Sequence, residues 1–274
     1  MPFRPLIAVL GPTACGKSAL ALDLARGFGF DIVNCDSRQV YREMEIGTAK
    51  PDAAERAAVP HHLFDLVSPD ERFSAGEYAR KATTCCEALW KQGRVPLLVG
   101  GTGFYYDALT EGLPEGTGDF ALQNQLQERL ATEGLLQLLD ELERLDPAGA
   151  ASIDRHNSRR VTRALELVLS SGQPLAEARK RQGALEADIL CIPVTIDRGL
   201  LHESIAGRVD MMLAAGLAGE ARSLLEKYGP EAPGMQTIGY SEWAAPGLPE
   251  SEVRESIIIH TRRYAKRQET WFRK

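Results

Sequence analysis

Short apolar runs alternate with helix-forming stretches along most of the chain. The first run, residues 6–10, lies between Pro5 and Gly11 and is continuously apolar, which is typical of a strand buried on both faces. Residues 18–26 and 75–90 have the pattern of helices. The strand pattern recurs at residues 32–35, 95–99 and 189–196. Strands that alternate with helices predict an α/β fold with a doubly wound, mostly parallel sheet.

The pattern changes between residues 114 and 183, where β-branched runs disappear and leucines recur at spacings of three and four residues. These leucines are Leu122, Leu126, Leu130, Leu135, Leu138, Leu139, Leu142 and Leu145. Asp146 ends one expected helix. Asn157 or Ser158 caps the next, which Gly172 ends. The spacing predicts an α-helical subdomain inserted into the α/β fold.

We therefore expect two domains. Residues 116–183 form the helical insertion, and residues 1–115 together with 184–274 form the α/β core. In the second part of the core, a helical region runs from about residue 200 to Gly229, and a final helix begins near residue 250. This last helix meets no stop signal, so we expect a short further segment beyond it.

Composition narrows the class of protein. The chain has 274 residues, 44% of them hydrophobic, which is enough for a full hydrophobic core. Its formal net charge of -6 argues against a protein that coats nucleic acid nonspecifically, because such binding needs a broad cationic surface. Any contact with nucleic acid must therefore be local.

The five cysteines form no C-x-x-C pair and no Cys/His grouping with the spacing of metal ligands, which indicates neither a zinc site nor a disulfide framework. The apolar run at residues 6–10 is too short for a signal peptide or a membrane span. We expect a cytoplasmic, monomeric protein in a reducing compartment, with no membrane association.

A glycine-rich motif follows the first expected strand. Its residues are Gly11, Pro12, Thr13, Ala14, Cys15, Gly16, Lys17 and Ser18, which match G-x-x-x-x-G-K-[ST] between a buried strand and a helix. In such a loop several backbone N–H groups point at a phosphate, Lys17 adds a positive charge, and the Ser18 hydroxyl can ligate Mg²⁺. The motif predicts a P-loop NTPase-like fold and a phosphorylated ligand.

Two strand ends are expected to face this P-loop, because ligands of open α/β sheets bind at the carboxyl ends of the strands. Asp36 follows one of them and has three interpretations: a ligand of Mg²⁺, a general base, or a cap on the following helix. Gly100, Gly101 and Thr102 follow the other strand. They bring the backbone close to a ligand and offer a hydroxyl, or they form a tight turn.

Several separate motifs, in the same order, closely resemble those of the bacterial tRNA dimethylallyltransferases (IPP transferase family). They are the P-loop and residues 36–41 (DSRQVY), 47–51 (GTAKP), 100–105 (GGTGFY), 159–166 (RRVTRALE), 236–240 (QTIGY) and 265–268 (AKRQ). The resemblance covers nearly the whole chain and implies a prenyltransferase with Mg²⁺ as cofactor. Such an enzyme transfers a dimethylallyl group from dimethylallyl diphosphate to N6 of the adenosine next to the anticodon, in tRNAs reading codons that begin with U.

The resemblance also implies roles for single residues. Asp36 accepts a proton from the attacking amine, which is a poor nucleophile because its lone pair is delocalised into the ring. Lys17, Mg²⁺ and a second cation, assigned to Arg222, stabilise the charge on the leaving diphosphate. Thr102 orients groups near the reacting carbon. Without the resemblance, Arg222 would be interpreted as part of a solvated helix face.

Residues that the resemblance implies in tRNA binding lie in both expected domains. They are Asp36, Ser37, Arg38, Gln39, Thr102, Gln123, Arg159, Arg160, Val161, Thr162, Arg163, Gln236, Gly239 and Tyr240. Gln123 stands where family members often place an arginine. Basic groups at residues 155–163 and 262–267 are the local patches that an acidic RNA-binding protein needs, or ordinary exposed helix faces.

Other classes of P-loop protein remain as alternatives. A small-molecule kinase would place arginines over a triphosphate in a mobile lid, and a nucleotide-dependent switch would carry a Walker B carboxylate and a water-positioning residue. An adenylate isopentenyltransferase would prenylate a free adenine nucleotide, but the arginine-rich helical insertion favours a macromolecular acceptor.

Overall fold

The computed structural model describes residues 3–114, 118–245 and 247–273. The chain divides into two compact units. The α/β unit consists of Met1–Phe73, Arg80–Tyr106 and Glu186–Lys274, and the helical unit consists of Ser74–Ala79 and Asp107–Leu185. The domain boundary that we expected between residues 115 and 116 falls outside the described residues.

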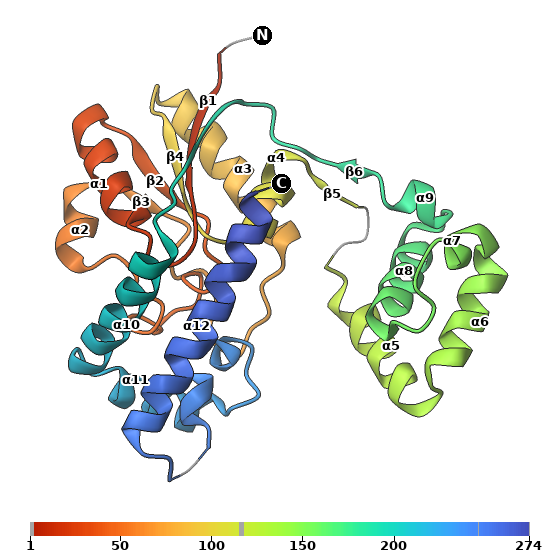
Figure 1. Ribbon diagram of the computed structural model, residues 1–274. Helices are drawn as coiled ribbons and strands as arrows, with labels where there is room; N and C mark the ends of the chain where they lie inside the picture. Colours follow the sequence, from red (N-terminus) through yellow and green to blue (C-terminus); the bar gives the residue numbers. More distant parts are fainter. Residues whose placement is uncertain (1–2, 115–117, 246, 274) are drawn as a thin grey trace. The chain divides into compact units, whose positions relative to one another are not determined.

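The α/β unit is built on a five-stranded sheet in which neighbouring strands are parallel (Figure 1). In spatial order the strands are β3 (His61–His62), β2 (Asp31–Asn34), β4 (Pro96–Gly100), β1 (Pro5–Leu10) and β7 (Asp188–Pro193). Val9 of β1 is in register with Val99 of β4 and Ile192 of β7. The doubly wound α/β fold is confirmed, and the carboxyl ends of the strands meet at one edge of the sheet.

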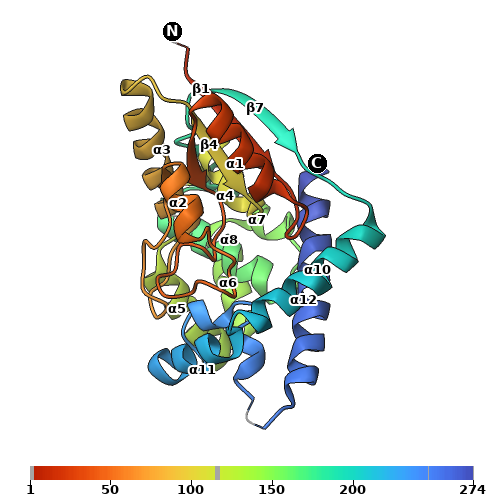
Figure 2. The same ribbon diagram turned by 90° about the vertical axis from the view of Figure 1, so that its left-hand side faces the viewer.

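Helices cover both faces of this sheet. Figures 1 and 2 show α1 (Lys17–Phe28) on one face and α3 (Ala75–Lys91) on the other. The small side chains of Ala21 and Ala25 let α1 pack closely on Val9, Ile32 and Leu97 of the strands. Two shorter helices, α2 (Ala53–Ala58) and α4 (Gly103–Thr110), follow the ends of β2 and β4 along the chain. The P-loop therefore lies between a mostly buried strand and a tightly packed helix.

The helical region expected from about residue 200 to Gly229 consists of two helices, α10 (Arg198–Ala214) and α11 (Leu217–Tyr228). Gly216 separates them with φ +101°, a conformation that favours glycine. Two short 3-10 turns, η1 (Gly234–Gln236) and η2 (Ser241–Trp243), lead to α12 (Glu250–Phe272), which packs against α10. Across the described residues, no helix combines the length and the apolar character needed to cross a membrane.

The helical unit has its own hydrophobic core. Its helices are α5 (Phe120–Thr132), α6 (Leu135–Leu145), α7 (Pro147–Ala151), α8 (Ser158–Ser171) and α9 (Leu175–Ala178). The leucines that recur at helical spacing meet here, and Leu138, Leu142 and Leu165 are fully buried. A short antiparallel pair, β5 (Leu113–Pro114) with β6 (Arg181–Gln182), was not predicted from the sequence.

The ends of these helices are fixed by polar caps. Asn157 accepts a hydrogen bond from the backbone N–H of Arg160 and caps α8, which ends at Gly172 with φ +65°. The buried carboxylate of Asp146 accepts hydrogen bonds from the backbone N–H groups of Gly149 (2.9 Å) and Leu175 (2.7 Å). Asp146 therefore caps α7 and also ties α9 to it.

Candidate active site

The P-loop connects β1 to α1 in a conformation that departs from ordinary backbone geometry. Ala14 has φ +62° and Gly16 has φ +91°, both in the left-handed region. A non-glycine residue in this region is strained, and such strain concentrates at functional sites. Lys17 is only 9% exposed, and its ammonium donates a hydrogen bond to the Pro12 carbonyl (3.0 Å). Burial lowers the pKa of Lys17 below its ordinary value.

Two cavities lie beside the P-loop. The first, which we call the P-loop cavity, has a volume of about 600 Å³ and is lined by Lys17, Ser18, Leu22 and Phe64 among others. The second, which we call the α12 cavity, has a volume of about 240 Å³. Its lining includes Arg38, Gln236, Gly239, Tyr264 and Arg267.

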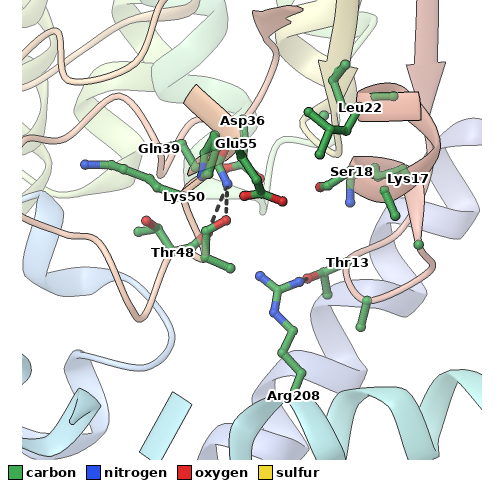
Figure 3. A pocket seen from close by; sticks show the side chains of 18 of the residues that line it. Thr13, Lys17, Ser18, Leu22, Asp36, Gln39, Thr48, Lys50, Glu55 and Arg208 are labelled. Atoms are coloured by element: carbon green, nitrogen blue, oxygen red, sulfur yellow. Dashed lines mark hydrogen bonds between the residues drawn. The ribbon is translucent and has the colours of Figure 1, made fainter. Parts of the chain in front are cut away.

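Four residues line both cavities: Thr13, Asp36, Thr48 and Arg208. They come from the P-loop, the loop after β2, residues 41–50 and α10. Figure 3 shows Arg208 extending from α10 towards Thr13, with Thr48 on the other side of the cavity. A phosphorylated ligand in one cavity and a second reactant in the other would meet at these four residues.

Asp36 both stabilises its own loop and lines the two cavities. Its backbone N–H donates to the Asn34 side chain (2.9 Å), and its carboxylate accepts a hydrogen bond from the backbone N–H of Arg38 (2.8 Å). This bond closes a local turn. No helix begins here, because the next one, α2, starts at Ala53, so the expected cap on a following helix is wrong. The bond uses one carboxylate oxygen, and Asp36 also lines both cavities, so the turn is compatible with a chemical role.

Thr102, in the loop after β4, supports the loop that carries Asp36. Its hydroxyl accepts a hydrogen bond from the backbone N–H of Ser37 (3.0 Å) and donates to the Ser37 hydroxyl (3.3 Å). Tyr264 of α12 is also hydrogen-bonded to Thr102. Burial and the nearby carboxylate of Asp36 raise the pKa of Tyr264 to about 12, so its phenol stays neutral at physiological pH.

The structure brings Arg208 to the P-loop, where we expected Arg222. The Nη1 of Arg208 donates a hydrogen bond to the Thr13 hydroxyl (3.0 Å). Burial lowers its pKa, and Asp36 opposes that shift. Arg222 is exposed on α11, where its guanidinium lies 4.9 Å from the centroid of the Trp243 ring. Arg222 lines neither cavity, because its side chain packs on an aromatic face instead.

The donor atoms of the P-loop cavity fit Mg²⁺ that is shared with a phosphorylated ligand. Ser18 and Asp36 line the same cavity and offer a hydroxyl and a carboxylate. In the described parts of the chain, no group of three or more His, Cys, Asp or Glu residues could hold a metal ion alone. Mg²⁺ commonly takes one or two protein ligands and fills its remaining positions with phosphate oxygens and water.

Residues expected to contact tRNA from the α/β unit fall into two groups. Arg38, Gln236 and Gly239 line the α12 cavity, and Gln39 lines the P-loop cavity. Tyr240 is fully buried, and its hydroxyl donates to Glu220 and accepts a hydrogen bond from the Gly47 N–H (3.1 Å). A ring in this position supports the wall of the site and is not available for stacking on a base.

The residues expected to bind tRNA from the helical unit are also divided. Arg159 and Arg160 are exposed at the start of α8. Val161 and Thr162 are buried in the core of the unit, because they lie on the face of α8 that packs on the other helices. They share that helix with Arg163, whose guanidinium pairs with the buried Glu166 (2.6 Å).

Gln123 is bound within the same unit. Its side-chain amide donates to Glu166 (2.8 Å), the carboxylate that also pairs with Arg163. Gln123 therefore helps to compensate a buried negative charge, which costs free energy when it lacks a partner.

Sequence reasoning gave no role to Thr48, Arg208, Tyr264 or Gln268. A partial signal existed for Arg208. Ser204, Gly207, Arg208 and Met211 all line the P-loop cavity, and their spacing places them on one face of α10. That pattern identifies a face of the helix but not what the face covers.

The parallel sheet carries a P-loop at its carboxyl edge, with a carboxylate and two cations beside two cavities that share lining residues. These features define the protein as an α/β P-loop enzyme. The chain belongs to the IPP transferase family, whose family model matches residues 39–274. A second model, for isopentenyl transferases, matches residues 5–62.

Individual relatives agree with this assignment. A tRNA dimethylallyltransferase of Moorella thermoacetica is 43% identical over 99% of this chain and 87% of its own length. The full-length tRNA isopentenylpyrophosphate transferase of Bacillus halodurans has a similar structure, with a TM-score of 0.71 and 36% identity, covering 98% of this chain and 87% of that one. A eukaryotic dimethylallyltransferase acting on tRNA gives a TM-score of 0.80 at 28% identity, over 98% and 69% of the two chains.

Proposed function

We propose that this chain is a tRNA dimethylallyltransferase, which transfers a dimethylallyl group from dimethylallyl diphosphate to N6 of an adenosine beside the anticodon. The observation that carries the proposal is the pair of cavities that share Thr13, Asp36, Thr48 and Arg208. One cavity offers a phosphate-binding loop and the other offers arginines, a tyrosine and polar side chains. A transferase with two different substrates needs this arrangement.

The charges in the site match the transfer step. The N6 amine attacks C1 of the dimethylallyl group, the bond between C1 and the diphosphate oxygen breaks, and the amine loses a proton. We assign that proton to Asp36, because its carboxylate lines both cavities. The P-loop amides, Lys17 and Arg208 stabilise the negative charge that grows on the leaving diphosphate. Mg²⁺, held by Ser18 and the phosphate oxygens, would neutralise part of the same charge.

A polynucleotide acceptor explains the positive charge on both units. Arg38 and Arg267 line the α12 cavity, and Arg159 and Arg160 are exposed on α8. An adenosine in a single-stranded loop leaves its stack at a cost of only a few kcal/mol, so it can enter such a cavity. Thr102 has the role of holding the Asp36 loop, through its bond to Ser37.

The test is transfer of labelled dimethylallyl from its diphosphate to unmodified tRNA with Mg²⁺ present, with AMP as a parallel acceptor and ATP as a competitor. Label at the adenosine beside the anticodon is the expected result. Label in AMP alone would indicate an adenylate isopentenyltransferase, and phosphate transfer from ATP would indicate a kinase.

The Asp36→Ala variant tests the proposed general base. We expect turnover to fall by roughly 100- to 10,000-fold, because a positioned base contributes about that factor. The dissociation constant for tRNA should change much less. Asp36→Asn is the matched control, since it keeps the hydrogen bond from the Arg38 N–H but accepts no proton. Full turnover in either variant would refute the assignment.

A further inference from the structure

Gln268 of α12 lies between the P-loop and the loop after β4. It is a polar residue that is only 5% exposed. Its side-chain carbonyl accepts a hydrogen bond from the backbone N–H of Thr13 (2.9 Å). Its side-chain NH₂ donates to the Gly101 carbonyl (2.8 Å). Both ends of the amide are therefore paired with backbone groups, as a buried amide requires.

The close approach of Gln268 depends on the glycine beneath it. A Cβ atom on Gly101 would lie 2.2 Å from the Gln268 nitrogen, well inside contact distance. One turn further along α12, the Trp271 ring covers Gly103 in the same way, at 2.2 Å from the position of a Cβ. These glycines make room for α12 and not for a ligand.

Thr13 transmits this contact to the charged part of the site. Its backbone N–H is bound by Gln268, and its hydroxyl accepts the hydrogen bond from Arg208 (3.0 Å). Thr13 and Arg208 line both cavities, whereas Gln268 lines neither of them. A continuous series of hydrogen bonds therefore runs from the loop after β4 through α12 and the P-loop to the guanidinium.

We propose that Gln268 is a positioning residue, which holds Thr13 so that its hydroxyl fixes the Arg208 guanidinium over the shared part of the two cavities. This inference rests on the proposed function. Electrostatic stabilisation of a leaving group depends on charges that are already oriented before the reaction. A displacement of about 1 Å in such groups can cost about 100-fold in rate.

The first test uses Gln268→Met, which has a similar length and shape but cannot make either hydrogen bond. We expect kcat for prenyl transfer to fall by roughly 10- to 100-fold, with a smaller change in KM for tRNA. Affinity for inorganic diphosphate, measured by calorimetry, should fall as well. The control is Glu269→Gln, one position along the same helix, which should retain wild-type values.

A double-mutant cycle separates positioning from general stability. Thr13→Val removes the hydroxyl that Arg208 binds and keeps the shape of the side chain. If Gln268 acts through Thr13, the second substitution costs less when the first is already present, so the two effects are not additive. Additive losses, or a Gln268→Met enzyme with a lower Tm but unchanged kcat and diphosphate affinity, would overturn the proposal.

The diphosphate measurement also separates this inference from the proposed function. A wild-type protein that binds diphosphate but prenylates no tRNA would refute the function and leave the effect of Gln268 measurable. If Gln268→Met does not fold, Thr13→Val alone decides: unchanged diphosphate affinity and turnover in that variant would refute the route through Thr13.

Discussion

The α/β unit and the helical unit hold their polar residues by different kinds of contact. In the α/β unit, site residues are fixed by hydrogen bonds between distant segments, such as Thr13 to Gln268 and Arg208 to Thr13, which are 255 and 195 residues apart. In the helical unit, polar contacts mostly cap or brace the helices around a leucine core, as Asp146 does. The comparison indicates that substituting a site residue held by such long-range bonds alters chemistry, whereas substitutions in the helical unit are expected to alter folding or RNA affinity.

The sharpest test of this comparison is the pair Arg208→Ala and Arg222→Ala. Arg208 is bound to Thr13 beside the P-loop, so we expect its loss to lower kcat by roughly 100- to 1,000-fold. Arg222 packs on Trp243, and its loss should reduce the free energy of unfolding by about 0.5 to 1 kcal/mol and leave kcat unchanged. Steady-state kinetics and denaturant titration measure both. The reverse ranking would return the role to Arg222.

Asp146→Ala should produce the largest loss of stability among the caps of the helical unit. Its buried carboxylate serves two backbone N–H groups, so we expect a loss of about 1 to 2 kcal/mol in the free energy of unfolding. Asp119→Ala is the matched control, because Asp119 caps α5 from an exposed position and accepts a hydrogen bond from the backbone N–H of Leu122 (3.0 Å). Equal losses of unfolding free energy in the two variants would show that the burial of the Asp146 carboxylate adds nothing to its cap.

The same carboxylate predicts a pH dependence. Hydrogen bonds from Gly149 and Leu175 lower the pKa of Asp146 in the folded state. Its contribution to stability is therefore fully present above the pKa of the unfolded chain, about 3.9, and is lost as the pH falls through the lower folded pKa. Asp146→Asn removes the titrating group, so its free energy of unfolding should fall less at acidic pH than that of the wild type. Denaturant titration at several acidic pH values measures this difference.

Arg160→Ala should have the smallest effect, a loss of electrostatic attraction that weakens tRNA binding. The dissociation constant for tRNA should rise. In a plot of the logarithm of the association constant against the logarithm of the salt concentration, the slope should become shallower by about 1, because one phosphate contact is lost. Turnover at saturating tRNA should remain. Arg144→Ala, on the exposed surface of α6, controls for a general loss of positive charge. Equal shifts for both variants would show that α8 has no special role.

Much of the fold could be predicted because it depends on local patterns. Continuous apolar runs identified β1, β2, β4 and β7, and the leucine spacing identified the helical unit. The burial of Val161 was also predictable, because Val161, Leu165 and Val168 are spaced so that they lie on one apolar face of a helix. The strand β3 was not predictable, because two residues give no periodic signal.

The site was predictable where a motif fixes it and not where the tertiary structure does. The P-loop and Asp36 follow from strand, loop and helix signals in a short stretch of sequence. Arg208 and Gln268 reach the P-loop only because α10 and α12 fold back onto it. Local sequence does not show which of Arg208 and Arg222 reaches the P-loop, because that depends on what each helix packs against.

The hydrogen bond between Thr13 and Gln268 has a consequence for biosynthesis. The P-loop leaves the ribosome well before α12, because Gln268 lies 255 residues after Thr13. Contacts of such long sequence separation form late, because the intervening chain must first be ordered. During translation the nascent protein therefore carries a phosphate-binding loop that lacks its brace, and the enzyme becomes competent only when α12 docks.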